Sequence, residues 1–146
     1  MRIINRKALH NYHILESLEA GIKLFGAEVK SVRAGRLELS QSHARIIGEE
    51  AYLINASIPP YQNAAMKSYD PQRSRKLLLH KSQIKSLIGR LSAGNLTLVP
   101  VAIYEKNNFV KVQLGLARSK KEFDKRKVMK ERDHQRRVEQ ELRGRE

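Results

Sequence analysis

The segment from Leu96 to Ala117 constrains the fold most, because it has the pattern of two long strands joined by a tight turn. Apolar residues dominate the first half, and Asn107-Asn108 supplies a turn dipeptide. After the turn, valine and leucine occupy every second position from Val110 to Leu116, so they share one face of a strand. A hairpin of this length predicts a β-rich domain with one buried face.

Shorter patterns predict the remaining elements of the domain. Residues 5–18 are predicted to form a lead-in and a first strand, and residues 38–58 a second hairpin that turns at Gly48. Residues 62–72 have the composition of a loop. The clearest helix has apolar residues at i, i+3, i+4 and i+7 and a glycine stop signal, and it contains Ile84, Leu87, Ile88, Leu91 and Gly94.

The stretch from Glu19 to Gly35 predicts a strand that enters a short helix, which ends at Gly35. Its apolar residues are expected to cover the core, while its charged residues point elsewhere, with Glu28 as a salt-bridge partner of a nearby lysine or arginine. Together these short strands and two covering helices predict a mainly β fold arranged as a small β-barrel of the OB type, for which we expect about three helices in all. Residues 1–117 would form this barrel.

Residues 118–146 differ in composition from the rest of the chain. They contain 12 Lys/Arg and 7 Asp/Glu, a net charge of +5, and too few apolar residues to fold alone. They are nevertheless rich in good helix formers. We therefore expect a basic C-terminal tail that is disordered when free and becomes helical on a polyanionic partner.

The net charge of +14 also indicates a polyanionic partner, for which nucleic acid is the first choice and a membrane surface the rival. Basic residues that converge would bind phosphates, and the candidate segments are Arg6-Lys7, Arg73 to Lys76, Lys111 and Lys120-Lys121. Tyr12, beside His13, is a candidate for stacking on an exposed base.

Other classes of function have little support in the sequence. No apolar run has the length of a membrane-spanning helix or a signal peptide, and the absence of cysteine excludes thiolate metal sites and disulfides. His10 and His13 would face opposite sides of an extended chain, which disfavours a shared metal. No catalytic motif is present, so we expect a cytoplasmic binding protein without cofactor, metal or enzymatic activity.

Several short motifs, in order, cover almost the whole chain and closely resemble the bacterial SsrA-binding protein (small protein B) family. They are Asn5-Arg-Lys-Ala, His10-x-Tyr12, Glu19-Ala-Gly-Ile, Gly26-x-Glu-Val-Lys-Ser-x-Arg-x-Gly35, Ile58-x-Pro-Tyr61, Arg73-x-Arg-Lys-Leu-Leu-Leu79, Asp124-Lys-Arg126 and Lys130-Glu-Arg-Asp133. Each motif is weak alone, but their combination is specific.

The resemblance implies an OB-like barrel that binds the tRNA-like domain of transfer-messenger RNA and brings it to stalled ribosomes for trans-translation. The protein would stand in for the anticodon arm that this RNA lacks. The tail would enter the empty mRNA channel near the decoding centre of the small-subunit rRNA and fold there as a helix. A monomer is expected.

The resemblance and the basic segments together assign candidate residues. The RNA-binding candidates are Asn5, Lys7, His10, Tyr12, Glu19, Gly21, Leu78, Lys111, Lys120 and Lys121; the ribosome-binding candidates of the tail are Phe123, Asp124, Lys125 and Arg126. Leu78 is equally compatible with a structural role. Ser119 stands where the family commonly has glycine, which implies a stiffer hinge, and Phe123 where it often has tyrosine or histidine. Two other functions stay open: constitutive binding of ribosomal RNA and architectural binding of DNA.

Overall fold

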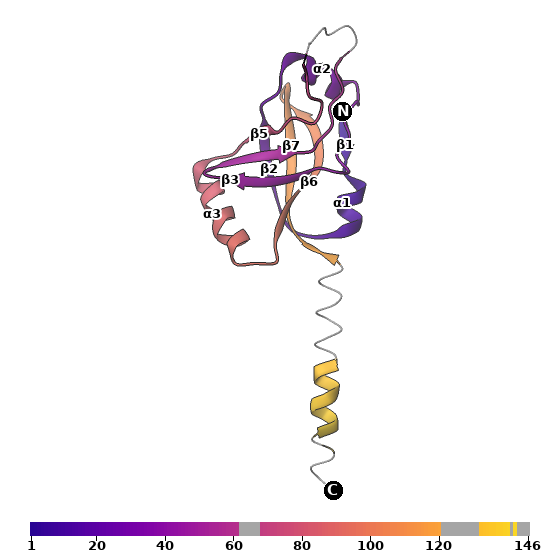
Figure 1. Ribbon diagram of the computed structural model, residues 1–146, viewed down its shortest axis with the longest axis vertical. Coiled ribbons are helices and arrows are strands. Elements are labelled where there is room, and N and C mark those ends of the chain that lie inside the picture. The colour runs from indigo at the N-terminus through magenta and orange to yellow at the C-terminus, as the bar shows by residue number, and fades with distance from the viewer. Residues whose placement is uncertain (62–67, 121–131, 141, 143–146) are drawn as a thin grey trace.

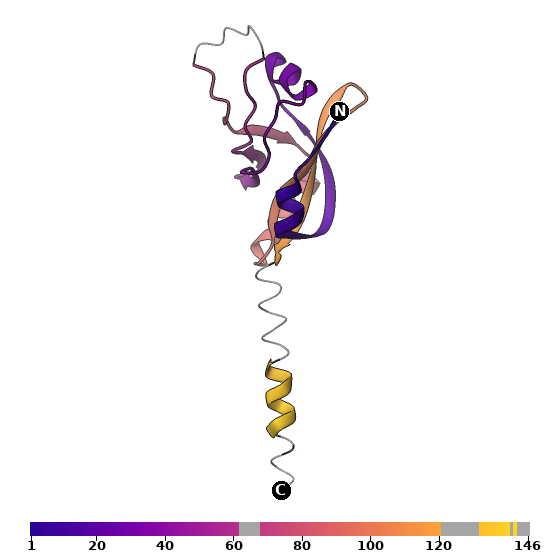
Figure 2. The same ribbon diagram turned by 90° about the vertical axis from the view of Figure 1, so that its right-hand side faces the viewer.

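The computed structural model describes residues 1–61, 68–120, 132–140 and 142. Figures 1 and 2 show strands that curve around a common interior, with helices at the periphery. The elements, in chain order, are β1 (Arg2–Ile4), α1 (Arg6–Asn11), β2 (Tyr12–Ile22), α2 (Gly26–Arg33), β3 (His43–Ile47), β4 (Glu50–Ile54), β5 (Arg75–Leu78), α3 (Lys81–Ser92), β6 (Thr97–Lys106) and β7 (Phe109–Ser119).

The strands form one antiparallel sheet in the order β1-β6-β3-β4-β5-β2-β7, and β6 also pairs with β7. This last pairing closes a ring of six strands, while β1 extends the far end of β6. Closure removes the open sheet edges that would otherwise invite pairing with another chain. The predicted OB-like barrel with about three helices is confirmed.

The β6–β7 hairpin follows the sequence pattern closely. Asn107 and Asn108 have φ of 52° and 67°, as a two-residue turn with the right-handed twist of the strands requires. Val112, Leu114 and Leu116 are fully buried in the main core. The other face of this hairpin is buried too, because α1 packs on it: Ala8 joins a second cluster with Val99, Val101 and Ala117.

The predicted extended conformation of residues 5–18 is wrong for Arg6–Asn11, which form α1. The Asn5 side chain caps this helix by accepting a hydrogen bond from the Ala8 N–H at 3.2 Å. A helix of six residues is too short to show a periodic apolar pattern, so only the cap signal was available. His10 therefore lies on a helix. The expectation that His10 and His13 face opposite sides of an extended chain, which disfavoured a shared metal ion, is wrong.

The predicted strand–helix corner at Glu19–Gly35 is confirmed. At the end of α2, Gly35 has a φ of +77°, its N–H donates to the Val32 carbonyl, and the Arg36 N–H donates to the Ser31 carbonyl. This pair of bonds satisfies carbonyls that the helix end leaves without partners, and the left-handed position favours glycine. Val32 is fully buried, as expected of the apolar side of the corner.

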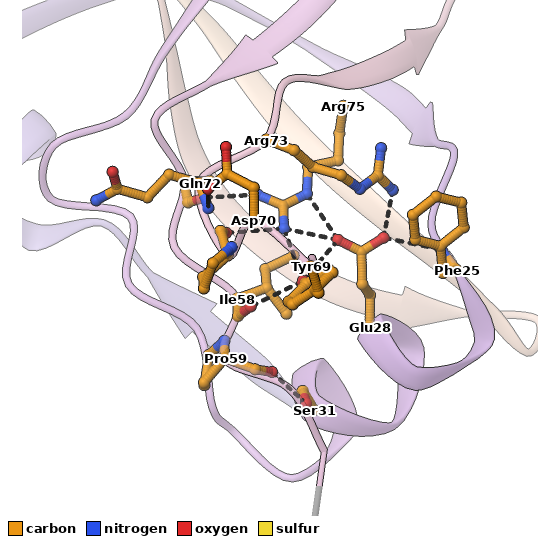
Figure 3. Close-up of polar contacts among 12 residues, drawn as sticks. Phe25, Glu28, Ser31, Ile58, Pro59, Tyr69, Asp70, Gln72, Arg73 and Arg75 are labelled. Atoms are coloured by element: carbon orange, nitrogen blue, oxygen red, sulfur yellow. Dashed lines mark hydrogen bonds and ion pairs between the residues drawn. The ribbon is translucent and has the colours of Figure 1, made fainter. Parts of the chain in front are cut away.

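The charged side of the corner differs from the prediction, because the Glu28 side chain is only 1% exposed and lies inside the protein. Figure 3 shows its carboxylate between Phe25, at the start of the same helix, and Tyr69, Arg73 and Arg75 from a distant stretch of the chain. Arg75 donates to Glu28 Oε2 through Nε at 2.9 Å and Nη2 at 2.6 Å, and Tyr69 Oη donates to the same oxygen at 3.0 Å. Arg73 and the Phe25 N–H donate to Oε1.

Arg75 is fully buried and holds more than the carboxylate. Its guanidinium also donates to the Ala56 carbonyl at 2.6 Å and to the Pro71 carbonyl at 2.9 Å. Because α2, the chain after β4 and the start of β5 all bond to Glu28 or Arg75, this pair fixes three segments relative to one another. The expected salt bridge of Glu28 is thus confirmed, but it is an internal one.

The predicted boundary between barrel and tail lies inside β7. This strand continues through Arg118 and Ser119, which pair with His13 and Tyr12 of β2. Farther along, residues 132–140 are helical. Tail residues 123–126 lie outside the described residues, and disorder of the free tail stays a prediction.

We expect Glu28→Gln to lower the free energy of unfolding at pH 7 by about 3–5 kcal/mol, because it leaves two buried or half-buried guanidinium groups without a counter-charge. Burial tends to raise the pKa of Glu28, but hydrogen bonds from Arg73, Phe25 and Arg75 outweigh it and hold this pKa below 4.5. The carboxylate therefore stabilises the fold above the unfolded pKa, and its contribution is lost as the pH falls through the folded value.

Urea unfolding at pH 7 and at pH 3 measures the loss of stability and its pH dependence. The difference in the free energy of unfolding between wild type and Glu28→Gln should be smaller at pH 3 than at pH 7. Glu16→Gln is the matched control, since Glu16 pairs with Arg90 on the exposed surface and should matter little. Equal stability of wild type and Glu28→Gln at pH 7 would contradict the role given to this pair.

Candidate nucleic-acid interface

A groove of about 630 Å³ lies where β2, β5 and β7 meet the start of α3. We call it the β2–β5–β7 groove. Four predicted RNA-binding residues from three separate strands line it: Glu19, Gly21, Leu78 and Lys111. Its other lining residues are Glu49, Glu50, Lys76, Leu77, Leu79, His80, Lys81, Gln83 and Ile84.

Strand register explains why these four residues come together. Gly21 of β2 pairs with Leu78 of β5 on one side and with Lys111 of β7 on the other. The Leu78 side chain lies against Gly21, so closely that a Cβ built on Gly21 would be 3.1 Å from the Leu78 Cβ. Leu78 is nevertheless half exposed, so the glycine lets an apolar side chain lie across the strand and face solvent.

The charges in the groove are mixed: three lysines face three glutamates among the lining residues. One of the three, Lys76, is already paired with Glu50 at 3.0 Å. A site of this composition is not a simple phosphate-binding patch. Carboxylates accept hydrogen bonds from base edges and from 2′-hydroxyls, and lysines contact phosphates, so the groove suits a folded or single-stranded RNA.

Glu19 is a groove carboxylate with both oxygens in contact with neighbouring side chains. Tyr104 of β6 donates its hydroxyl to Glu19 Oε2, and Lys106 Nζ lies 3.6 Å from Oε1. The hydrogen bond from Tyr104 is the main cause that lowers the pKa of Glu19 from its ordinary value. Partial burial and the bond to Glu19 raise the pKa of Tyr104 to about 12. Glu19 is therefore an ionised acceptor at neutral pH.

A second groove, of about 370 Å³, separates α1 from residues 40–43 and the start of β6. Three further predicted residues line it: Asn5, Lys7 and Tyr12. Asn5 is only 4% exposed, and its Nδ2 donates to the Pro100 carbonyl at 2.9 Å and the Leu39 carbonyl at 3.3 Å. The amide thus joins α1 to β6 and to the chain before β3.

Seven of the ten predicted RNA-binding residues thus line one of the two grooves. His10 is exposed on α1, outside the lining of both, and Lys120 follows directly after β7. Lys121 and the tail candidates Phe123, Asp124, Lys125 and Arg126 lie outside the described residues.

Treating Arg73 to Lys76 as one phosphate-binding cluster was wrong for Arg75, which is buried against Glu28. Arg73 also makes contacts within the protein: it pairs with Glu28, and its guanidinium stacks 4.0 Å from the centre of the Phe25 ring. Lys76 does line the groove with Lys111. Charge runs in a sequence do not separate cations that face solvent from those that neutralise an internal carboxylate.

Tyr104 was missed by the sequence analysis, although a signal for it existed. With a two-residue turn at Asn107-Asn108, the hairpin register places Tyr104 opposite Lys111, as the structure shows. That register already puts a tyrosine hydroxyl beside the β7 side of the groove. The pairing of β7 with β2, which brings Glu19 within reach, had no such local signal.

Among residues 1–61, 68–120, 132–140 and 142, no cluster of three or more histidine, cysteine or acidic side chains is arranged to hold a metal ion. Over those same ranges, no helix has the length and apolar character needed to cross a membrane.

Comparison with known proteins gives concordant results. The model of the family described as SmpB protein matches residues 2–144. The SsrA-binding protein of Carboxydothermus hydrogenoformans is 50% identical over 141 residues, which cover 97% of this chain and 95% of that protein. The SsrA-binding protein of Mycolicibacterium paratuberculosis is 49% identical, covering 94% of this chain and 82% of that protein.

A solved structure is also similar. It is described as "tmRNA-SmpB: a journey to the center of the bacterial ribosome", and one of its chains superposes with a TM-score of 0.68 at 48% identity. The match covers 82% of this chain and 84% of that chain.

We expect Gly21→Ala to displace the Leu78 side chain, because the new methyl group would also lie 3.3 Å from Leu78 Cδ1. Rotation of the solvent-facing Leu78 side chain relieves the contact with Cδ1, while the contact with Cβ needs only a shift of a few tenths of an ångström, so the stability loss should be small, about 1 kcal/mol. The measurement is the chemical shift of the Leu78 methyl groups. Gly89→Ala is the control, since nothing lies within 4 Å of its Cβ position. Unchanged Leu78 methyl shifts in Gly21→Ala would contradict the close packing.

Proposed function

This chain belongs to the SmpB protein family, and from that membership we propose that it binds transfer-messenger RNA and delivers it to stalled ribosomes in trans-translation. Within this RNA the protein would bind the tRNA-like domain, as the family resemblance implies. It would stand in for the anticodon arm that the RNA lacks. The protein would act as a monomeric binding protein of the cytoplasm, without enzymatic activity.

One observation carries the site assignment: Glu19, Gly21, Leu78 and Lys111, from strands far apart in sequence, line one groove. We assign the contact with transfer-messenger RNA to this groove. Lys111 is suited to a phosphate, Glu19 to hydroxyl or amino donors of the RNA, and Leu78 to the apolar face of a ribose or base.

The predicted residues on and beside α1 have two different roles, one structural and one in binding. Asn5 is buried and acts by fixing α1 rather than by touching RNA. Lys7, His10 and Tyr12 then present a second nucleic-acid contact on or beside this helix. Lys120 and Lys121 follow β7 in the sequence, and their positive charge suits further contacts with phosphates.

The tail is proposed to act on the ribosome, not in RNA capture. Its composition and the helical state of residues 132–140 support a helix that lies in the empty mRNA channel. Phe123 would stack on a base of small-subunit rRNA near the decoding centre, and Asp124, Lys125 and Arg126 would contact the ribosome after delivery.

A competition gel at about 0.15 M salt, where surface electrostatics are moderately screened, tests the proposed partner. Labelled transfer-messenger RNA bound to the full-length protein should be displaced by its own tRNA-like domain and resist bulk tRNA and rRNA fragments. Equal displacement by rRNA fragments would favour constitutive rRNA binding instead, and equal displacement by duplex DNA would favour an architectural DNA binder.

Removal of residues 121–146 should preserve affinity for transfer-messenger RNA and abolish tagging of stalled chains in a reconstituted translation system. The cut follows Lys120, not the predicted boundary at Ala117, because Arg118 and Ser119 belong to β7. A full-length variant with alanine at positions 124, 125 and 126 serves as the matched control for simple loss of length, and it should also fail in tagging. Normal tagging by the truncated protein would refute the role of the tail.

A further inference from the structure

Tyr104 and Glu19 form a close pair on the outer face of the barrel, at the junction of β6, β7 and β2. The tyrosine hydroxyl donates to Glu19 Oε2 across 85 positions of sequence. Lys106, from the same strand as Tyr104, approaches the other carboxylate oxygen at 3.6 Å. In the ladder, Glu19 is opposite Gln113, and Tyr104 is opposite Lys111.

The tyrosine ring is itself held in place from the other side. Arg2 of β1 is opposite Tyr104 in the sheet, and its guanidinium lies 5.3 Å from the centre of the ring. Arg2 also donates to Gln113 Oε1 at 3.4 Å. Arg2, Tyr104, Glu19 and Gln113 are therefore linked by contacts between neighbouring side chains from four strands.

A carboxylate on an RNA-facing surface must be oriented to be useful, because phosphates repel it and neighbouring lysines compete for it. Lys106 already lies 3.6 Å from Glu19 Oε1, and a carboxylate free to rotate would also turn toward Lys111, which would remove an acceptor and a cation from the groove together. The tyrosine hydroxyl occupies one of roughly four acceptor positions of an ionised carboxylate, and Lys106 lies near the other oxygen. The positions left over stay available to donors of the RNA.

The geometry points to Tyr104 as a positioning residue for RNA binding, which holds the Glu19 carboxylate in the orientation that accepts hydrogen bonds from the RNA. This inference rests on the proposed function, since it refines how the β2–β5–β7 groove contacts transfer-messenger RNA. Tyr104 acts through Glu19 and does not itself line the groove.

Tyr104→Phe removes the hydroxyl and keeps the ring that packs beside Arg2, so the fold should persist. Affinity for the tRNA-like domain, measured by filter binding with the full-length protein, should fall about 3- to 10-fold, the cost of ordering one freed side chain on binding. In a Glu19→Ala background, which removes the acceptor of the tyrosine hydroxyl, the same tyrosine change should alter affinity by less than about 2-fold, because coupled residues are not additive.

A readout without RNA tests the contact itself. The Glu19 side-chain pKa, followed by carbon-13 NMR of the carboxyl group, should rise toward its ordinary value in Tyr104→Phe. Tyr52→Phe is the matched control, because Tyr52 donates to Glu50 at 2.6 Å in the same way; it should raise the pKa of Glu50 and leave that of Glu19 unchanged.

The combined results separate this inference from the proposed function. Lower affinity, non-additivity and a raised Glu19 pKa together support it. An unchanged Glu19 pKa, unchanged affinity, or an equal loss in the Glu19→Ala background overturns it while leaving RNA binding intact. Failure of the unchanged protein to bind the tRNA-like domain, even with a raised Glu19 pKa in Tyr104→Phe, overturns the proposed function and this inference with it.

Discussion

The buried pair of Glu28 and Arg75 is the constraint on which the rest of the structure depends. Removing two charges from water costs several kcal/mol for each ion, and only close geometry with further hydrogen bonds offsets that cost. Here the carboxylate accepts from two arginines, a tyrosine and a backbone N–H, and Arg75 also reaches two backbone carbonyls. The pair stabilises one relative placement of α2, β5 and the chain between β4 and β5.

That placement connects the polar interior to the candidate RNA surface. Arg75 begins β5, and Leu78 ends the same short strand, so fixing the first residue fixes where the last one meets β2. Only two residue pairs join β2 to β5, Gly21–Leu78 and Ile22–Leu77. So brief a ladder needs support from elsewhere. The Lys23 N–H, which donates to the Lys76 carbonyl, and the Glu28–Arg75 pair beyond it provide that support.

The sequence predicted most of what local patterns can specify. Alternation predicted the β6–β7 hairpin, and glycine stops predicted the ends of α2 and α3. Helix α1 was not predicted because six residues carry no periodic signal. The arginine partners of Glu28 were not predicted because they lie 45 and 47 positions away, beyond the range of any local pattern. The site residues came from motif resemblance. Their division between two grooves, and the support that Tyr104 gives Glu19, followed only from strand register.

We propose that the Glu28–Arg75 pair, by holding β5 in place, supports the β2–β5 junction that forms part of an RNA-binding groove between β2, β5 and β7. Hydrogen–deuterium exchange of the full-length protein, with and without the tRNA-like domain of transfer-messenger RNA, tests it most directly. RNA should slow exchange at the amides of Gly21, Leu78 and Lys81 and leave the turn after α2, at Gly35, unchanged, since Gly35 lines neither groove. Protection confined to the turn after α2, with none along the groove, would contradict the assignment.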